Sequence, residues 1–245
     1  MCARYTLTVP DFGALARMLS VPVDLDPELA AHYRPRHNVA PSTQQLVLRG
    51  REDGRELVPA SWGLLNRWVK DPSTTTRHIN ARSEGARTKP AFREAFSRRR
   101  CVVPADGFFE WKGAKGKRQP LWFHPREGGL LHMAGLYEDW TDPTTGEAIR
   151  TFTILTTTPN EVVAPVHDRM PAILDPADVD AWLGLSEGVT AEQAEALLRP
   201  APSELLATRQ VSRRVNSPGV DEPSLLNEEQ EEAKGTLPLF GKMPL

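Results

Sequence analysis

The chain has 245 residues, of which 40% are hydrophobic and 25% are charged, and its formal net charge is -2. These values are typical of a soluble globular protein, and the length allows one domain or two small ones. No apolar run approaches the roughly 20 residues that span a bilayer, and the first residues lack the basic start and apolar stretch of a signal peptide. Two cysteines make neither a disulfide framework nor a zinc cluster. We therefore expect a cytoplasmic protein with no membrane segment, no metal and no cofactor.

The first part of the chain predicts short helices around one β-hairpin. Residues 11–19 have the spacing of a helix, with an aspartate placed to cap its start. Two strand patterns with a turn between them predict a hairpin over residues 44–65. Residues 89–99 predict a short helix with Pro90 near its start, where proline is tolerated. This order lacks the regular strand-helix alternation of a doubly wound fold.

The second part of the chain predicts mostly strands. Four segments rich in β-branched and aromatic residues, with Gly and Pro between them, cover residues 100–112, 118–125, 128–140 and 148–159. Two helices and a last strand follow, over residues 177–185, 190–199 and 208–216. Because strands dominate and no internal repeat is visible, we expect an α+β fold with curved, mainly antiparallel sheets.

Cys2 directly follows the start methionine and is open to two interpretations. A free cysteine is most often a small buried hydrophobe, here on a first strand. If Met1 is removed, Cys2 instead presents an α-amine and a thiol on neighbouring carbons. The amine, with a reference pKa of about 7.7 to 8, can attack an aldehyde to form an imine, which the thiolate can close to a thiazolidine. The opened sugar of an abasic site in DNA is such an aldehyde.

Three other polar residues are candidates for the same chemistry. Glu110 lies between two aromatic residues in ADGFFEWK, where lost solvation would raise the carboxyl pKa and make it a general acid or base. His167 stands in a predicted turn and can titrate near pH 7. Asn80 could donate a hydrogen bond to a sugar or phosphate oxygen. Each has an ordinary interpretation too: an outward-facing strand carboxylate, an exposed loop histidine, and an asparagine that satisfies its own backbone.

The charges are unevenly distributed along the chain. Residues 217–245 carry six acidic residues against two lysines, a net of -4, which leaves +2 for residues 1–216. Residues 77–100 hold only two acidic residues among eight basic ones. Such a block could hold a phosphate backbone, although a charge run is also common on a solvated helix face. The eight cations are Arg77, Arg82, Arg87, Lys89, Arg93, Arg98, Arg99 and Arg100.

Nine segments carry a resemblance to a known family: MCARY, RHNVAPS, SWGLLNRW, INARSEG, RRCVVPADGFFEW, AGLYEDW, FTILTTTPN, HDRMPAIL and VSRRVNSP. In this order they resemble the SRAP family, the SOS response-associated peptidases, which comprises abasic-site processing proteins of bacteria and eukaryotes. The segments cover residues 2 to about 218. Composition does not produce nine collinear matches, so the resemblance is specific.

The resemblance implies a role for each candidate residue. After autocatalytic removal of Met1, Cys2 would form a thiazolidine crosslink with an abasic site and shield the lesion. Asn80 is similar to the family asparagine that orients the reacting sugar. Glu110 resembles the glutamate that transfers protons during ring opening and during methionine removal. His167 is similar to the histidine that assists Schiff-base chemistry, the associated strand scission and reversal of the crosslink.

The resemblance also implies the architecture and the DNA partner. Residues 1–217 would form one SRAP-type domain, with a barrel-like core of β-sheet, flanking helices and a basic channel for single-stranded DNA that contains abasic sites. Weaker similarities assign DNA contacts to Arg4, Asn38, Trp68 and Arg82. We expect a bacterial monomer that associates with the nucleoid when it binds DNA.

Residues 218–245 are acidic and rich in proline without periodicity, which predicts a disordered tail. Near its end, GTLPLFGK places Leu237, Leu239 and Phe240 in a polar setting. This stretch is similar to short C-terminal peptides that dock on bacterial sliding clamps, although it lacks their usual leading glutamine.

Two alternative functions stay open at the level of sequence. In one, the chain is a cysteine-type peptidase in which Cys2 attacks an amide of another protein, with its own amine as base. In the other, it is a single-stranded DNA-binding module in which Cys2 is inert. Incubation with an abasic oligonucleotide distinguishes all three hypotheses.

Overall fold

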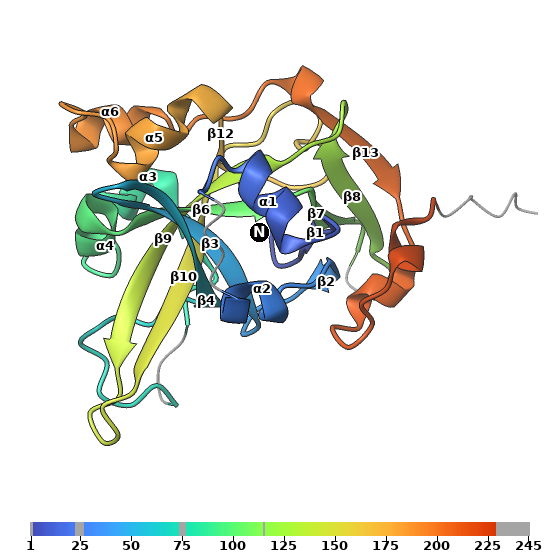
Figure 1. Cartoon of the computed structure of the whole chain (residues 1–245). Coiled ribbons are helices and arrows are strands. Elements are labelled where there is room, and N and C mark those ends of the chain that lie inside the picture. The colour runs from blue at the N-terminus through green and yellow to red at the C-terminus, as the bar shows by residue number, and fades with distance from the viewer. Residues whose placement is uncertain (1, 23–26, 74–76, 115, 229–245) are drawn as a thin grey trace, which may run out of the picture.

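A closed β-barrel forms the centre of the structure, a computed structural model that describes residues 2–22, 27–73, 77–114 and 116–228 (Figure 1). Within these residues the barrel follows the order β10-β4-β3-β6-β9 and closes through a pairing of β9 with β10. Its neighbours are antiparallel except β10 and β4, which run parallel at Thr151↔Ser61 and Phe152↔Trp62. The predicted α+β fold with a barrel-like, mainly antiparallel core is therefore confirmed. The barrel strands are β3 (Gln44–Arg51), β4 (Gly54–Trp62), β6 (Arg100–Ala105), β9 (Leu131–Thr141) and β10 (Ala148–Thr157).

A second sheet with the order β13-β8-β7-β1-β2 lies beside the barrel. The segment predicted as a single strand over residues 100–112 belongs to both sheets, because it is divided at Asp106 into β6 and β7. Asp106 accepts hydrogen bonds from the hydroxyls of Thr6 and Thr8 and from the amide of Thr8, which fixes the change of sheet. The strands of this sheet are β1 (Tyr5–Leu7), β2 (Arg36–Val39), β7 (Gly107–Lys112), β8 (Gln119–Pro125) and β13 (Leu206–Gln210).

Short strands extend the barrel at β9 and β10. β5 (Asn80–Arg82) runs parallel to β10, β11 (Met170–Pro171) pairs with β10, and β12 (Ile173–Leu174) pairs with β9. β5 and β11 bring two separate segments of the chain to β10. β10 therefore positions both the residues after Ile79 and the turn that ends at Met170.

The helices are short and lie outside the sheets (Figure 1). Asp11 caps the first of them through a bond from Ala14 N at 2.7 Å, and Thr190 forms a capping box with Gln193. The helices predicted over 11–19, 89–99, 177–185 and 190–199 are confirmed, each over a shorter span. The α-helices are α1 (Phe12–Met18), α2 (Pro27–His32), α3 (Ser83–Ala86), α4 (Arg93–Arg98), α5 (Val179–Leu183) and α6 (Ala191–Ala196), and the 3-10 helices are η1 (Pro176–Asp178), η2 (Ser203–Leu205), η3 (Arg213–Asn216) and η4 (Pro223–Leu226).

Aromatic side chains join the barrel to the elements around it. The ring of Trp62 stacks on Phe152 at 6.2 Å between centroids and contacts Tyr5 of the second sheet at 5.2 Å. Trp182 of α5 donates to the carbonyl of Cys101 at 2.8 Å, and all of these side chains are fully buried. Cys101 is thus a buried residue of β6. Burial of this kind removes apolar surface from water and supplies most of the stability of a barrel core.

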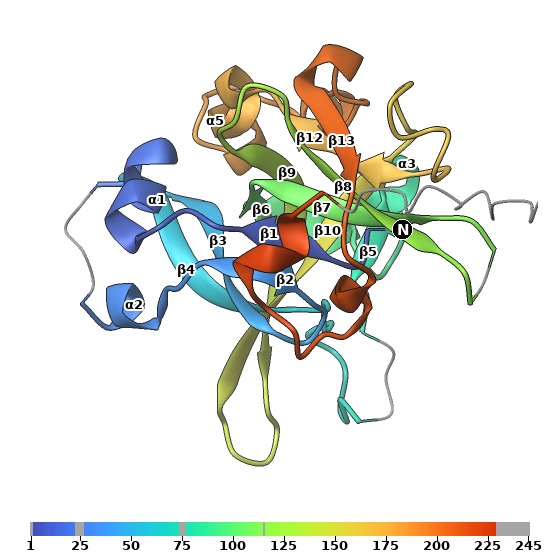
Figure 2. The ribbon, with the colours of Figure 1, turned by 90° about the vertical axis from the view of Figure 1, so that its right-hand side faces the viewer.

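The chain after residue 205 differs from the sequence-based expectation. The strand predicted over 208–216 ends at Gln210, and η3 takes its place. Residues 218–228, expected to be disordered, fold back through η4 across the second sheet (Figure 2). The physical reason is that Leu225 is fully buried against that sheet and Val211 pairs with Glu228. The remaining residues of the predicted tail, including Leu237, Leu239 and Phe240, lie outside the described residues.

None of the helices in the described part of the chain has the length and hydropathy of a membrane span.

Candidate active site

Asn80 connects the barrel to the first residues of the chain. Its side-chain amide donates a hydrogen bond to the carbonyl oxygen of Cys2 at 2.7 Å. Asn80 pairs in register with Ile154, and the indole of Trp62 donates to the carbonyl of Ile79 at 2.8 Å. Among the described residues, Asn80 Oδ1 is buried without a hydrogen-bond partner. The barrel therefore fixes the amide that holds the Cys2 backbone.

Glu110 lies on β7, next to the first residues of the chain. β1 and β7 pair at Tyr5↔Phe108, and the amide of Phe109 continues this ladder to the carbonyl of Arg4 at 3.0 Å. Glu110 is only 3% exposed. Burial raises the pKa of its carboxyl above the ordinary value, and the interaction with His167 partly opposes this rise. A carboxyl with a raised pKa can both accept and donate a proton near neutral pH.

Cys2 is fully buried in the structure, and its thiol lies 3.5 Å from the carbonyl oxygen of Arg4. Burial raises the pKa of the Cys2 thiol well above its ordinary value, and the negative charge of Glu110 raises it further. In this arrangement the thiol keeps its proton. Any reaction of Cys2 as a nucleophile therefore needs a group that takes the proton, and Glu110 is the neighbouring acceptor.

His167 stands in the turn between β10 and β11, with a quarter of its side chain exposed. Its Nδ1 accepts a hydrogen bond from the backbone amide of Arg169 at 3.0 Å and also lies 2.9 Å from a carboxylate oxygen of Asp168. With Nδ1 as the acceptor, the neutral ring carries its proton on Nε2.

The turn that carries His167 is tied to the segment that carries Asn80. Arg169 forms two bonds with the Glu84 carboxylate, at 2.6 and 2.9 Å, and also donates to the carbonyl of Thr156. The Arg169 side chain is only 9% exposed. The sequence analysis did not single out this pair. Its only trace in the sequence is an acidic residue in INARSEG and a basic residue in HDRMPAIL. The pair links two segments that are 85 residues apart.

The structure thus brings the predicted catalytic residues together. Asn80 bonds to Cys2, the Glu110 charge acts on the Cys2 thiol, and His167 acts on Glu110. They come from the start of the chain, from β5, from β7 and from the turn after β10. Such a cluster can move protons to and from Cys2, whose backbone is held in place by Asn80.

The four residues predicted to contact DNA have different environments. Trp68 is 56% exposed, on a loop that Trp140 holds through a bond from Nε1 to Val69 O at 2.7 Å. Arg82 is exposed, two residues after Asn80. Arg4 is partly buried and donates to Val215 O at 2.7 Å.

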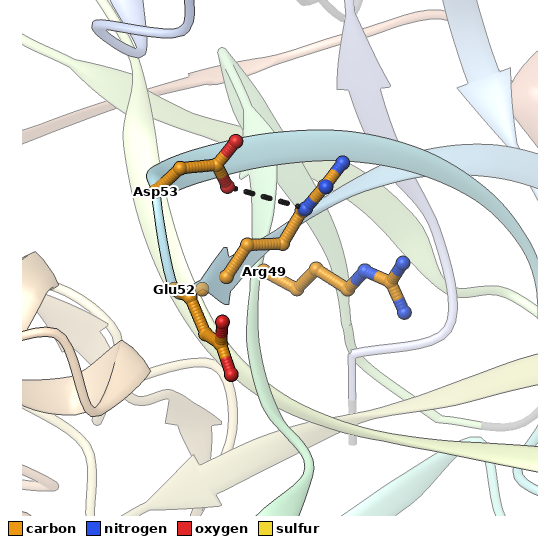
Figure 3. Close-up of a pocket in the computed structure, with 5 residues that line it drawn as sticks. Arg49, Glu52 and Asp53 are labelled. Atoms are coloured by element: carbon orange, nitrogen blue, oxygen red, sulfur yellow. Dashed lines mark ion pairs between the residues drawn. The ribbon is translucent and has the colours of Figure 1, made fainter.

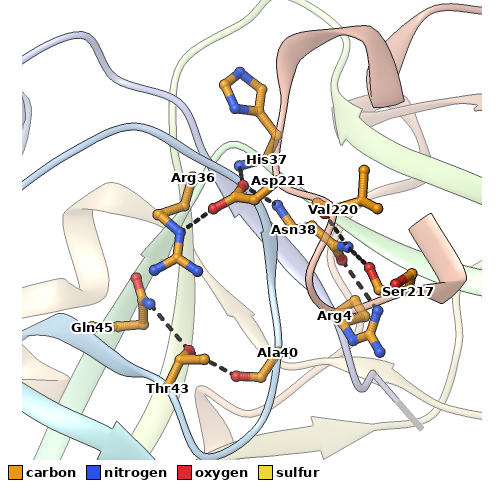
Figure 4. Close-up of polar contacts among 10 residues, drawn as sticks. All are labelled: Arg4, Arg36, His37, Asn38, Ala40, Thr43, Gln45, Ser217, Val220 and Asp221. Carbon is orange, nitrogen blue, oxygen red and sulfur yellow. Dashed lines mark hydrogen bonds and ion pairs between the residues drawn. The ribbon is translucent and has the colours of Figure 1, made fainter. Parts of the chain in front are cut away.

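Asn38 differs from the expectation of a direct DNA contact. Its side chain is fully buried, and its side-chain amide donates to the carbonyls of Ser217 and Val220 (Figure 4). The same amide donates to the carbonyl of Val215. Its Oδ1 accepts from Arg4 at 3.2 Å. In this structure Asn38 therefore holds other parts of the protein, and a direct contact with DNA would require these bonds to break.

The basic block over residues 77–100 does not form one continuous surface. Arg87 pairs with Glu192 and Glu195 of α6. Arg99 pairs with the buried Glu138, and Arg100 donates to backbone carbonyls and lies over the ring of Trp182. At least these three of the eight cations are therefore engaged within the protein.

A pocket of about 530 Å³ opens at the turn of the β3–β4 hairpin (Figure 3). Its cations are neutralised locally, since Arg49 pairs with Glu56 at 2.7 Å and Arg51 with Asp53 at 3.3 Å. The pocket shares no lining residue with the candidate site. It is formed by Arg49, Gly50, Arg51, Glu52 and Asp53.

The fold and the site together define a barrel-centred α+β protein whose candidate nucleophile is the second residue of the chain. The model of the SOS response associated peptidase (SRAP) family matches residues 1–218, and the chain belongs to this family. The sequence-based resemblance is thereby confirmed.

Known relatives agree with this assignment, and a solved structure shares the fold. The chain is 36% identical over 227 residues to the abasic site processing protein YoqW of Bacillus subtilis, covering 92% of this chain and 99% of the relative. It is 36% identical over 225 residues to the abasic site processing protein HMCES of Gallus gallus, covering 79% and 66%. A crystal structure of a protein from Bacteroides thetaiotaomicron has the same fold, with a TM-score of 0.83, 24% identity, and coverage of 94% of this chain and 100% of the other.

Proposed function

We propose that this chain processes abasic sites in single-stranded DNA and crosslinks them through Cys2 after Met1 is removed. Membership of the SRAP family and the names of its relatives support abasic-site processing. The observation that carries the crosslinking proposal is a buried acid whose charge acts on the thiol of Cys2. Glu110 is buried and acts on the thiol of Cys2, while Asn80 holds the Cys2 carbonyl.

Removal of Met1 is the first step of the proposal. Hydrolysis breaks the Met1–Cys2 peptide bond, adds the hydroxyl of water to the Met1 carbonyl carbon, and leaves the Cys2 nitrogen as an amine. Glu110 takes the proton from the attacking water and returns a proton to the leaving nitrogen. Its raised pKa suits both transfers, because the carboxyl is neither a strong acid nor permanently ionised.

Crosslinking then proceeds in two bond-forming steps. The Cys2 amine attacks the C1 aldehyde of the opened abasic sugar, and loss of water gives an imine. The Cys2 sulfur next bonds to the same carbon, and the thiol proton passes through Glu110 to the imine nitrogen. The product is a thiazolidine, so aldehyde plus aminothiol yields the ring and one water.

His167 and Asn80 assist these steps from either side. Nε2 of the neutral His167 ring can donate its proton to the sugar oxygen that leaves as water. In the reverse direction, the same nitrogen can accept a proton when the thiazolidine opens or when the strand is cleaved at the imine stage. Asn80 keeps the Cys2 backbone in place, and its Oδ1 is available for a hydroxyl of the sugar.

We assign DNA binding to two exposed groups, Arg82 and Trp68, and to other basic residues of the domain. Arg82 can contact a phosphate, and Trp68 can stack on an unpaired base. Arg4 is the weaker candidate, because its guanidinium donates to Asn38 and to the carbonyl of Val215. Because phosphate contacts release counterions, binding before crosslinking should weaken with salt.

A denaturing gel tests the proposal. The purified chain is incubated with a single-stranded oligonucleotide that carries one abasic site, and mass spectrometry first establishes whether Met1 is absent. The expected result is a covalent adduct with the mass of protein plus DNA minus one water, which Cys2→Ser abolishes. Cleavage of peptides without an adduct would favour a peptidase, and DNA binding with neither product would favour a binding module.

A further inference from the structure

Asp221 fastens the last described segment of the chain to β2 (Figure 4). Residues 213–228 are called the C-terminal strap here. One oxygen of Asp221 accepts from the backbone amides of His37 at 2.6 Å and Asn38 at 3.0 Å, and the other accepts from Arg36 Nε. β2 is the outer strand of its sheet, so this carboxylate takes the place of a further strand.

Asn38 joins the C-terminal strap to Arg4. The Asn38 amide donates to the carbonyls of Val215 at 3.2 Å, Ser217 at 3.0 Å and Val220 at 2.8 Å. Its oxygen accepts from Arg4 at 3.2 Å. Asp221 therefore holds the backbone amide of Asn38, and the buried Asn38 side chain binds the backbone of the strap and the Arg4 guanidinium.

Arg4 in turn reaches Cys2. Its guanidinium donates to Val215 O at 2.7 Å, which fixes the side chain against the strap. Its carbonyl accepts from the Cys2 thiol at 3.5 Å and from the Phe109 amide at 3.0 Å. Arg4 is thus held at its side chain by the strap and at its backbone by β7, two residues from the nucleophile.

The strap also contacts both neighbours of Glu110. Trp111 donates from its indole to the Asn216 side chain at 2.6 Å. Phe109 belongs to a buried cluster with Val215 and Leu225 of the strap. A displacement of the strap would therefore reach the proton-transferring acid as well as the nucleophile.

We propose that Asp221 is a positioning residue for the reaction of Cys2, acting through Asn38 and Arg4. The proposal rests on the proposed function, since it concerns the same reaction. Asp221 lies beyond residue 218, where the match to the family model ends. Ring closure requires nitrogen, sulfur and the sugar carbon in bonding geometry, and a displacement of about 1 Å can cost roughly a hundredfold in rate. Fastening of the strap limits that displacement.

The test separates reaction rate from DNA affinity and from the amount of folded protein. Wild type, Asp221→Ala, Asp221→Asn and the control Glu222→Gln are compared at saturating abasic oligonucleotide. Glu222 is a suitable control because its carboxylate bonds to Arg214 and Ser224 within the same strap. Affinity is measured separately, with an oligonucleotide that carries a tetrahydrofuran in place of the reactive sugar.

We expect Asp221→Ala to crosslink roughly tenfold to a hundredfold more slowly, with full final yield and unchanged affinity for the unreactive oligonucleotide. Asp221→Asn should be intermediate, because its oxygen still accepts from the β2 amides, and Glu222→Gln should match wild type. A wild-type rate in Asp221→Ala, or a lower yield at the wild-type rate, would overturn the proposal. If Asp221→Ala does not fold, a wild-type rate of crosslinking in Asp221→Asn would also overturn the proposal. Absence of any adduct with wild type would instead reject the proposed function, and this proposal with it.

Discussion

Arg169 and Glu84 form a two-bond ion pair that joins the turn of His167 to the segment of Asn80. The two contacts measure 2.6 and 2.9 Å, and the guanidinium is nearly buried. Neither residue is a predicted catalytic group. Their pairing nevertheless connects two segments that contribute catalytic candidates, because Glu84 lies on α3 directly after β5 and Arg169 lies in the turn between β10 and β11.

Loss of this pair should slow crosslinking and lower stability. Arg169→Ala should cost about 1–3 kcal/mol in the free energy of unfolding, since it removes charged hydrogen bonds at a buried position. Glu84→Gln should slow crosslinking roughly tenfold through a shift of the His167 turn. Rates from denaturing gels and thermal unfolding measure both effects, and Glu192→Gln, on the exposed Arg87 pair, is the control. Simple additivity of the Arg169 and Glu84 changes in a double-mutant cycle would contradict the coupling.

The same pair predicts a pH dependence of stability. Hydrogen bonds from Arg169 lower the pKa of the Glu84 carboxyl in the folded state. Its contribution is therefore present above the unfolded pKa of about 4.3 and is lost as the pH falls through the lower folded value. The difference in the free energy of unfolding between wild type and Glu84→Gln should shrink in acid. Urea titrations at a series of pH values measure it, and a constant difference would reject the ion pair as the cause.

Glu110→Gln should separate catalysis from stability. Without a proton acceptor beside Cys2, crosslinking should slow by roughly a hundredfold or more. Burial raises the pKa of the Glu110 carboxyl, so this group favours the folded state below its unfolded pKa, and that benefit is lost as the pH rises through the folded value. Glu110→Gln should then be at least as stable as wild type at pH 7. A less stable variant with a normal rate would refute the assignment of Glu110.

Trp68→Ala should weaken DNA binding without unfolding the protein. Trp68 is more than half exposed, so its ring contributes little to the core. Loss of one stacked base should cost about 1–3 kcal/mol of binding free energy. Fluorescence anisotropy with a single-stranded oligonucleotide measures the affinity. Equal affinities of variant and wild type would show that the exposed ring is not part of the DNA surface.

Arg82→Gln should reduce the salt dependence of binding. Removal of one phosphate contact lowers the slope of log K against log salt by about one. Arg51→Gln, at the hairpin turn, is the matched control and should leave the slope unchanged. Anisotropy titrations at several salt concentrations give the slopes. Identical slopes for all three proteins would place the DNA away from Arg82.

Gly107→Ala should destabilise the second sheet. A Cβ at this position would lie 2.1 Å from the indole nitrogen of Trp122 and 2.9 Å from the carbonyl of Phe123. Because neither can move without displacing β8, we expect a loss of about 1–3 kcal/mol or more. Thermal unfolding measures it against Gly219→Ala, which adds a methyl group to open space. Equal melting temperatures for the two variants would show that the sheet adapts to the added carbon.

The local patterns of the sequence were sufficient for most elements but not for their pairing. Segments rich in β-branched and aromatic residues, with Gly and Pro between them, predict barrel strands, and Asp11 predicts the start of α1. The division of residues 100–112 between two sheets left no periodic signal, because both halves are equally apolar. It depends on Asp106 meeting Thr6 and Thr8 from the other end of the domain.

The structure of residues 218–228 differs from the prediction for a similar reason. Its acidic, proline-rich composition predicts disorder, yet residues 218–228 are folded. The segment has no periodicity of its own and takes its structure from partners on β2 and β7. Asp221 bonds to the amides of His37 and Asn38, and Leu225 fills a gap beside Phe109. Composition averages over such contacts, so it cannot reveal them.

By itself, the sequence determined which residue types are available for chemistry. Cys2 is the one position in the chain where loss of a single methionine creates an aminothiol, and the aromatic neighbours of Glu110 already predicted a raised pKa. Only the tertiary structure decided that Asn80 bonds to that residue, that the charge of Glu110 acts on its thiol, and that His167 acts on Glu110. The reason is that these contacts depend on pairings between distant strands, whose register is set by packing of the whole barrel and not by any local pattern.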